Sequence, residues 1–327
     1  MRVFALALLG PAMILAAAEP SQSPWKIENN PVLTPGDSNT WDSQSITYPS
    51  VVRTRDKWML IYQGTAIDES GPHTAFGCAQ SEDGIVWKKI QNTPVFSPDT
   101  GIDQLTEAPN FTAWKGGFSL VYLVNPFLVR GHPGREYENS GREPRLAQST
   151  DALHWRDLRV RHLPLGSNIS ADSAPCIYAD KRVLYLWWIG AENDKLMLCH
   201  SVSRDGVEWS KPSAQPTSEI DSRPILDARV YPSGDFYLLT YVAETEGEAK
   251  RTKSYFLVTK VSRDARTWTR KGPPEFALPQ PCVPFMVFTP GGARLYYDEQ
   301  ERTSDGRIST RATLRSAFCP KANYENR

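Results

Sequence analysis

A seven-residue pattern recurs along this chain and constrains its fold more than any other feature. The pattern Ser-x-Asp-[Gly/Ala]-x-x-Trp occurs four times, beginning at Ser81, Ser149, Ser203 and Ser262. The Ser and Asp side chains suit hydrogen bonding to the backbone of their own turn, Gly tolerates a positive φ, and Trp packs between neighbouring units. Recurrence of this kind is typical of a repeat architecture, with each copy forming a turn between strands.

A second element precedes each heptad: a proline followed by apolar residues, and then a short aromatic strand. The prolines are Pro49, Pro109, Pro175, Pro224 and Pro284. We expect the aromatic strands at residues 57–62, 117–122, 183–188, 235–241 and 293–297. Each unit therefore supplies an inner strand, an aromatic strand, a third strand ending at the Ser and a fourth strand opening at the Trp.

The fifth unit stops before its heptad, and its missing strand has a counterpart near the other end of the chain. Its third strand is expected at Ile308 to Leu314, and no Trp follows it. The segment Trp25-Lys-Ile27 matches Trp87-Lys-Lys-Ile90, which opens a fourth strand. We therefore expect an all-β fold for residues 19–327: a single domain, a five-bladed β-propeller whose last blade is closed by the N-terminal strand. Two stacked β-sandwiches, the alternative, explain neither the repeat nor the displaced copy.

Residues 1–18 predict a secretory signal peptide. Met1-Arg2 is a short basic start, Val3 to Leu15 is an almost unbroken apolar run, and Ala16 to Ala18 is a small-residue cleavage signal. The apolar run is too short to span a bilayer comfortably, and no second segment approaches eighteen apolar residues. We expect a secreted or periplasmic protein without a membrane span.

Charge and cysteine content limit the partners. The 37 Lys and Arg residues balance 37 Asp and Glu residues, and there is no basic block, so neither nucleic acid nor an anionic membrane is an expected partner. We expect a monomer. The five cysteines have no metal-ligand spacing, so we expect buried thiols, with neither a metal nor a cofactor. Because export permits disulfides, Cys282–Cys319 is the pair to test.

Strand direction alternates within each unit and sorts the loops onto two faces. The starts of the inner strands, together with the loops between second and third strands, lie on one face, and the Ser-x-Asp turns lie on the other. Function is expected where the inner strands converge on a central channel. The Asp residues of the heptads are therefore interpreted as structural.

Acidic and aromatic residues gather on the converging face. Stacking surfaces combined with carboxylates are what recognition and acid/base cleavage of a sugar require. A polar segment from Asn125 to Arg145 follows a second strand, as a cap over the channel or as an ordinary solvated insertion.

The pattern Trp41-Asp42-Ser…Tyr48-Pro-Ser-Val-Val…Met59-Leu-Ile-Tyr-Gln-Gly, with Phe76-Gly-Cys-Ala-Gln-Ser before the first Asp-Gly turn, resembles a known group. This is the five-bladed arabinanase/levansucrase/invertase-like superfamily, which includes glycoside hydrolase families 32, 43 and 130. The resemblance covers essentially the whole chain after residue 18 and implies its fold. Activity transfers less cleanly: Tyr48 stands where family 43 has its first Asp, and the Asn-Asp-Pro-Asn-Gly signature of family 32 is absent.

We therefore expect an exported glycoside hydrolase-like protein that acts on a glycan by carboxylate acid/base chemistry. The expected acid is Glu107 and the expected base is Asp42 or Asp172, with Asp221 positioning the substrate. Expected substrate-binding residues are Trp41, Tyr48, His73, Arg130, Arg145, Arg223 and Glu299.

Two alternatives stay open. The missing Asp before Pro49 favours a propeller that binds glycans or scaffolds an exported complex without catalysis. A sialidase-like enzyme also uses Asp-containing turns, but it needs three arginines with a nucleophilic Tyr, and five blades argue against it.

Overall fold

The computed structural model describes residues 23–69, 71–97, 104–126, 143–158, 163, 173–180, 183–192, 195–233, 235–246, 253–270, 272–302 and 308–323. The predicted signal peptide lies outside these residues. The described residues form β-strands and two short 3₁₀ helices, Thr217–Glu219 and Lys321–Asn323, so the prediction of an all-β protein is confirmed.

One sheet contains eight strands. Its order is β19-β20-β21-β2-β3-β4-β5, with β1 also paired to β21. The strands are β1 (Lys26–Ile27), β2 (Ser45–Arg53), β3 (Trp58–Asp68), β4 (Gly71–Ser81), β5 (Lys88–Lys89), β19 (Phe285–Thr289), β20 (Gly292–Arg302) and β21 (Ile308–Pro320). β21 meets β2 in a parallel bridge between Ala312 and Ser45, which joins the two antiparallel halves of the sheet.

Three further antiparallel sheets follow the chain in order. The first contains β6 (Gln104–Trp114), β7 (Gly117–Pro126), β8 (Glu143–Ser149) and β9 (Trp155–Asp157). The second contains β10 (Cys176–Asp180), β11 (Val183–Glu192), β12 (Lys195–Ser203) and β13 (Ser213–Pro216). The third contains β14 (Ile225–Ser233), β15 (Phe236–Glu246), β16 (Lys253–Ser262), β17 (Thr269–Arg270) and β18 (Phe276–Leu278).

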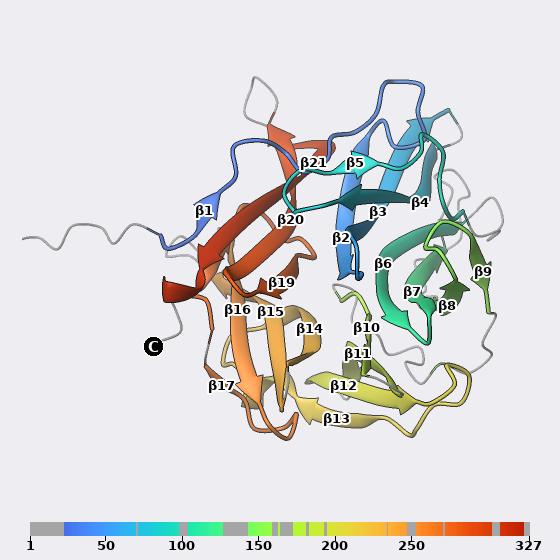
Figure 1. Ribbon diagram of the computed structural model, residues 1–327. Helices are drawn as coiled ribbons and strands as arrows, with labels where there is room; N and C mark the ends of the chain where they lie inside the picture. The colour runs from blue at the N-terminus through green and yellow to red at the C-terminus, as the bar shows by residue number, and fades with distance from the viewer. Residues whose placement is uncertain are drawn as a thin grey trace, which may run out of the picture.

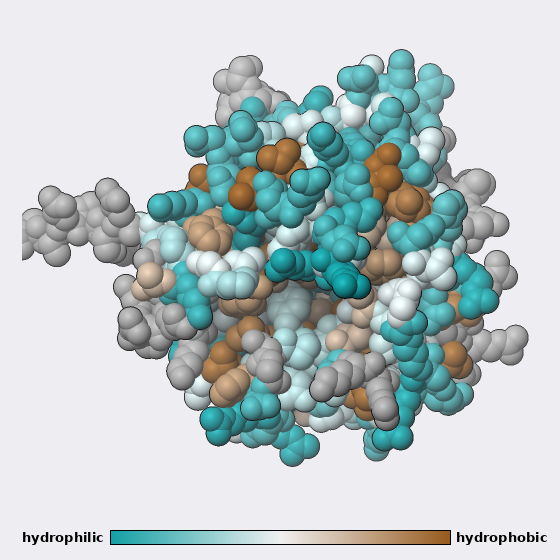
Figure 2. Space-filling view, in the orientation of Figure 1, coloured by the Kyte–Doolittle hydropathy of each residue, from teal (hydrophilic) through white to brown (hydrophobic). Residues whose placement is uncertain are grey.

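The sheets are arranged around a common centre, with β2, β6, β10, β14 and β19 nearest to it (Figure 1). Contacts join β2 to β6, β6 to β10, β10 to β14 and β19 to β2. Between β14 and β19, the rings of Tyr231 and Phe285 meet edge to face at 5.6 Å. We call these five the inner strands. The surface is hollowed near the centre of this view, and residues of mixed hydropathy border the hollow, with the most hydrophilic ones above it (Figure 2).

The segment around Trp25 lies against the last strand, as the repeat predicts. β1 pairs antiparallel with β21, placing Lys26 opposite Phe318 and Ile27 opposite Ala317. The Trp25 ring is buried, and its Nε1 donates a 2.8 Å hydrogen bond to the carbonyl oxygen of Pro274. This contact attaches the segment to the neighbouring β14–β18 sheet as well.

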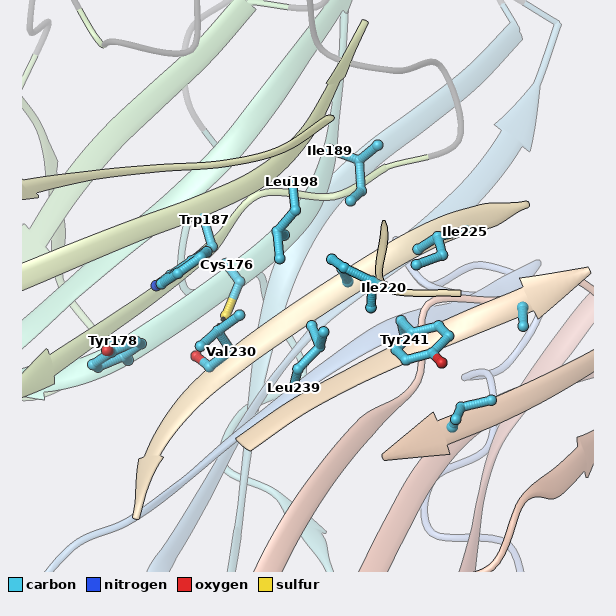
Figure 3. Close-up of a cluster of buried hydrophobic side chains, with 13 residues drawn as sticks. Cys176, Tyr178, Trp187, Ile189, Leu198, Ile220, Ile225, Val230, Leu239 and Tyr241 are labelled. Carbon is cyan, nitrogen blue, oxygen red and sulfur yellow. Dashed lines mark hydrogen bonds between the residues drawn. The ribbon is translucent and has the colours of Figure 1, made fainter. Parts of the chain in front are cut away.

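Apolar side chains fill the space between neighbouring sheets. Between the β10–β13 sheet and the β14–β18 sheet, Trp187 and Leu198 from β11 and β12 pack with Val230 and Leu239 from β14 and β15 (Figure 3). Full burial of an aliphatic side chain contributes roughly 1.5–3 kcal/mol. Such clusters between sheets hold the inner strands around the centre.

The heptads form the predicted turns. The Oγ of Ser81 accepts a 2.9 Å hydrogen bond from the Gly84 N–H, and Asp83 Oδ1 accepts from the N–H groups of Ile85 and Val86. The Asp151, Asp205 and Asp264 turns bind their backbones in the same way. The fourth residue of each heptad has a positive φ: Gly84 (74°), Ala152 (64°), Gly206 (82°) and Ala265 (57°). The heptad carboxylates are therefore used by their own turns.

All five cysteines carry free thiols, and four of them are buried. Cys282, the half-buried exception, is not bonded to Cys319. Among the described residues, no helix has the length and apolarity needed to cross a membrane.

Candidate functional site

A cavity of about 370 Å³ lies where the inner strands converge. Residues in or next to all five inner strands line it, together with one on β20: Tyr48 on β2, Ala108 on β6, Ser173 before β10, Leu226 on β14, Cys282 before β19 and Asp298 on β20. The volume is within the range of small-ligand sites. The convergence predicted for this face is therefore present.

Residues that precede the recurrent prolines meet beside this cavity. Ala108, Ala174 and Val283 form an apolar cluster with Leu123, and Tyr48 packs against it. In the β14–β18 sheet, Leu226 lines the cavity, whereas Arg223 before Pro224 lies elsewhere. A register irregularity between Ile225 and Asp227 accompanies this difference.

Two residues at the cavity have an unusual backbone conformation. Tyr48 and Ala108 have φ values of 52° and 54°, each just before a proline and within a strand irregularity. This left-handed region is uncommon for residues other than glycine and costs on the order of 1–3 kcal/mol. In this conformation the backbone N–H of Ala108 donates to Gln63 Oε1 at 3.1 Å, and the backbone N–H of Tyr48 donates to Asp298.

Asp298 is a buried carboxyl group at this cavity. Asp298 is 7% exposed, and its Oδ2 accepts a 3.4 Å hydrogen bond from Gln280 Nε2. Burial raises the pKa of Asp298 to about 7, although hydrogen bonds from its own backbone N–H, from Gln280 and from the Tyr48 N–H act in the opposite direction. A carboxyl group with a pKa near neutrality can deliver or accept a proton close to neutral pH.

A second carboxylate lies nearby. Burial raises the pKa of the Cys282 thiol well above its ordinary value, and the negative charges of Asp298 and Asp227 raise it further. Asp227 is buried: its Oδ1 accepts a 2.9 Å hydrogen bond from the Ala174 N–H, and its Oδ2 lies 3.7 Å from Arg229 Nε. Two buried carboxyl groups in different surroundings therefore flank one cavity thiol.

Gln63 offers a structural comparison for Asp298. Gln63 follows the buried Tyr62 on β3, and Asp298 follows the buried Tyr297 on β20. Each accepts a hydrogen bond from a left-handed residue of a neighbouring inner strand. A neutral amide performs this task at Gln63, so the contact alone does not require the acidic group of Asp298.

Asp42, one of the two residues predicted as the base, lies in a largely buried ion pair with Lys89. The Asp42 side chain is 3% exposed, and its Oδ2 lies 2.6 Å from Lys89 Nζ. The Tyr62 hydroxyl donates to the same oxygen at 3.3 Å. Trp41, predicted to bind substrate, stacks on the Tyr62 ring at a centroid distance of 5.8 Å. These contacts attach the segment before β2 to β3 and β5.

Asp221 and Arg223 also bind each other. Arg223 donates from Nε to Asp221 Oδ1 at 3.1 Å and from Nη2 to Asp221 Oδ2 at 2.9 Å. The same guanidinium contacts Glu275 at 2.9 Å. Burial acts to raise the pKa of Asp221, but hydrogen bonds from Arg223 and Tyr241 outweigh it and hold the pKa well below its ordinary value. Asp221 is therefore ionised and its oxygens are engaged.

The remaining predicted residues are dispersed. Glu107 is half-buried on β6, beside Ala108 and opposite Leu123. Asp172, Arg130 and the segment 127–142 lie outside the described residues. The other three contact acidic or basic neighbours: His73 with Asp68 at 3.0 Å, Arg145 with Asp157 at 3.9 Å and Glu299 with Arg315 at 2.9 Å. Tyr48 is the predicted residue found in the cavity lining.

In the part of the chain that the structure describes, His, Cys, Asp and Glu side chains form no group of three or more suited to a metal ion.

Comparison with known sequences gives limited information. No protein-family model matches the chain. Over 185 residues, 56% of this chain, it is 29% identical to uncharacterized protein MT1551 of Mycobacterium tuberculosis strain CDC 1551 / Oshkosh. The same length is 28% identical to uncharacterized protein Rv1502 of strain ATCC 25618 / H37Rv. The matched part spans 60% of each of these relatives.

Comparison with solved structures identifies the fold. Zg3597, a family 117 glycoside hydrolase from Zobellia galactanivorans, matches with a TM-score of 0.61 and 14% identity over 90% of both chains. The catalytic domain of the Coprinopsis cinerea family 62 α-L-arabinofuranosidase matches with a TM-score of 0.57 and 15% identity, over 92% of this chain and 98% of that domain. The fold is that of the propeller-type glycoside hydrolases, as the sequence resemblance implies.

One similar structure has a different activity in its description. An N-acetylgalactosamine deacetylase from F. plautii, in complex with blood group B trisaccharide, matches with a TM-score of 0.60 and 14% identity over 89% of this chain and 95% of that chain. Proteins of this fold therefore include more than one glycan reaction, and the reaction must be argued from the site.

Proposed function

We propose that this protein is an exported, glycan-acting hydrolase whose site is the central cavity, with Asp298 as its proton-transferring group. The observation that carries the proposal is a buried carboxyl with a pKa of about 7, placed in a cavity to which every inner-strand region contributes. The glycan-acting proteins of the same fold support it.

The proposed chemistry uses carboxyl groups in two protonation states. Below pH 7, protonated Asp298 donates its proton to the oxygen of the bond that breaks. Asp227, whose Oδ2 lies 3.7 Å from Arg229 Nε, is the second carboxylate of the proposal, to activate water or to stabilise positive charge on the sugar. Their different surroundings set the two roles.

The predicted catalytic residues enter this proposal unequally. Glu107, next to the cavity residue Ala108, stays a candidate for substrate contact, and Asp172 stays a prediction. The ion pairs of Asp42 and Asp221 favour structural roles for both.

We also propose that residues 19–327 form a single five-bladed β-propeller completed by the N-terminal strand. The contacts among the five inner strands and the pairing of β1 with β21 support this arrangement. The predicted cleavage after Ala18 is tested by N-terminal sequencing of protein collected outside the cytoplasm, which should begin at Glu19. An intact Met1 in that fraction would contradict the predicted processing.

The activity is tested by incubating the purified protein with a panel of α- and β-linked glycans and measuring released reducing ends, with released acetate measured separately. Asp298→Asn keeps an oxygen acceptor for the Tyr48 N–H but loses the acid, so turnover should fall by about 10²-fold or more. Asp221→Asn is the matched control, and turnover per folded molecule should stay close to that of the unsubstituted protein.

Full turnover by folded Asp298→Asn would contradict the assignment of Asp298. Glycan binding without any turnover by the unsubstituted protein would instead support the alternative of a non-catalytic propeller, which the structural ion pairs of Asp42 and Asp221 favour.

A further inference from the structure

The side-chain amide of Gln280 connects two groups at the cavity. Its Oε1 accepts a 3.1 Å hydrogen bond from the backbone N–H of Gln300, and its Nε2 donates to Asp298 Oδ2 at 3.4 Å. Gln280 is 8% exposed, so water does not compete freely for these contacts. Gln300 lies on β20, two residues beyond Asp298.

The first contact determines the direction of the second. A backbone N–H can only donate, so the carbonyl oxygen of Gln280 must face Gln300. The NH₂ group of the same planar amide then faces Asp298. Gln280 is therefore a fixed donor to the carboxyl group, and the Tyr48 N–H is a second donor.

We propose that Gln280 is a positioning residue: held by the Gln300 N–H, its amide orients the Asp298 carboxyl group at the cavity and stabilises the ionised form. This inference rests on the proposed function for the role of Asp298, whereas its contacts are independent of any activity. Gln280 would hold the Asp298 carboxyl group in the same orientation before and after each proton transfer.

The other groups around Asp298 come from different elements. Cys282 precedes β19, Asp227 is on β14, and Tyr48 contributes its N–H from β2. Burial favours the protonated carboxyl, whereas hydrogen bonds from the backbone N–H of Asp298 itself, from Gln280 and from the Tyr48 N–H favour the ionised one. Removal of one donor should therefore displace the titration of Asp298 towards higher pH.

The test follows the titration of Asp298 directly. Aspartate carbons are ¹³C-labelled, carboxyl signals are followed by NMR from pH 4 to 9, and Asp298→Asn identifies the relevant signal. Gln280→Leu removes the donor, and the midpoint should rise by on the order of one pH unit, the equivalent of one lost hydrogen bond. Gln280→Glu replaces the amide with an acid, and the midpoint should rise further.

Gln300→Ala is the matched control, because it keeps the backbone N–H that holds Gln280, and the midpoint should not change. If Gln280→Leu fails to fold, Gln280→Met supplies the same test with a longer apolar side chain. An unchanged midpoint in either folded variant overturns the proposal.

Activity measurements separate this inference from the proposed function. If the protein hydrolyses a glycan, the pH profile of kcat/KM should move in the same direction as the NMR midpoint, which a purely structural loss would not produce. If the midpoint moves but the unsubstituted protein has no activity, the positioning role stands and the hydrolase proposal fails.

Discussion

The hydroxyl of Tyr241 donates a 2.6 Å hydrogen bond to Oδ2 of Asp221, twenty residues earlier in the chain. Tyr62 contacts Asp42 across the same sequence interval, at 3.3 Å. Both tyrosines are buried, on β15 and β3, the strands that follow the inner strands β14 and β2. Each carboxylate also forms an ion pair with a basic side chain, Arg223 or Lys89. The recurrence indicates a structural device that attaches the segment before an inner strand to the next strand.

Removing one hydroxyl from this device should lower stability. Tyr241→Phe should reduce the free energy of unfolding by about 1.5–3 kcal/mol, because the hydrogen bond lost is made to a charged, largely buried carboxylate. Urea unfolding measures the change. Tyr255→Phe, at a half-buried position on β16, is the control and should change stability by less than about 0.5 kcal/mol. Equal effects of both substitutions would contradict the assigned role.

Asp298 should make the protein less stable as pH rises. Its folded-state pKa of about 7 lies above its unfolded value, so the folded protein holds a proton that the unfolded chain releases. The contribution of Asp298 to stability is therefore greatest below about pH 4 and is lost as the pH rises to about 7. The full effect is at most about 4 kcal/mol.

Asp298→Asn removes this titration, so its stability relative to the unsubstituted protein should increase between pH 4 and pH 8. Urea unfolding across that range measures the difference. Asp56→Asn, at an exposed position, should show no comparable trend. A constant difference for Asp298→Asn would show that Asp298 does not titrate in this interval.

In the Asp-containing turns, two substitutions at the same heptad position should change stability in opposite directions. Ala265 has a φ of 57°, a region that costs a residue with a Cβ about 1–2 kcal/mol, so Ala265→Gly should stabilise the protein by up to about 1 kcal/mol. Gly206, at the same heptad position with a φ of 82°, should lose about 1 kcal/mol on substitution by Ala. Thermal unfolding checks both signs. The same sign for both would contradict the strain argument.

Trp25 should be required for stability despite its place before the first strand. Trp25→Ala removes a buried ring and its hydrogen bond to Pro274, and should cost about 3–5 kcal/mol. Ile27→Ala, two residues later and 57% exposed, should cost less than about 0.5 kcal/mol. Denaturant unfolding distinguishes the two. A tolerated Trp25→Ala would mean that β1 contributes little to the sheet.

The strand order could be predicted because its signals are local. The Ser-x-Asp turns require particular side chains within seven residues. On four of the five inner-strand segments, the residue directly before the recurrent proline lies at or beside the cavity. The fourth proline is misleading: Arg223 turns towards Glu275, and the cavity position belongs to Leu226 instead. Such a register irregularity depends on strand pairing, which a single sequence does not reveal.

Asp298 was not predicted as a site residue because its properties arise from distant parts of the chain. Its burial and its Tyr48 contact join β20 to β2, about 250 residues apart. The available signal was positional: Asp298 follows Tyr297 as Gln63 follows Tyr62. Conversely, Asp42 stands at a promising sequence position, but its partner Lys89 lies 47 residues later, which its local pattern does not indicate. Asp221 and its neighbour Arg223 were both predicted to bind substrate, but they bind each other.

The pairing of Lys26 with Phe318 has a consequence for biosynthesis. The segment carrying β1 is synthesised long before β21, so β1 has no strand to pair with until β21 has been made. An unpaired edge of this kind invites pairing with other chains. Aggregation and proteolysis of nascent protein should therefore concentrate on the interval before residue 320 is synthesised, and helper proteins that hold extended chains would act during that interval.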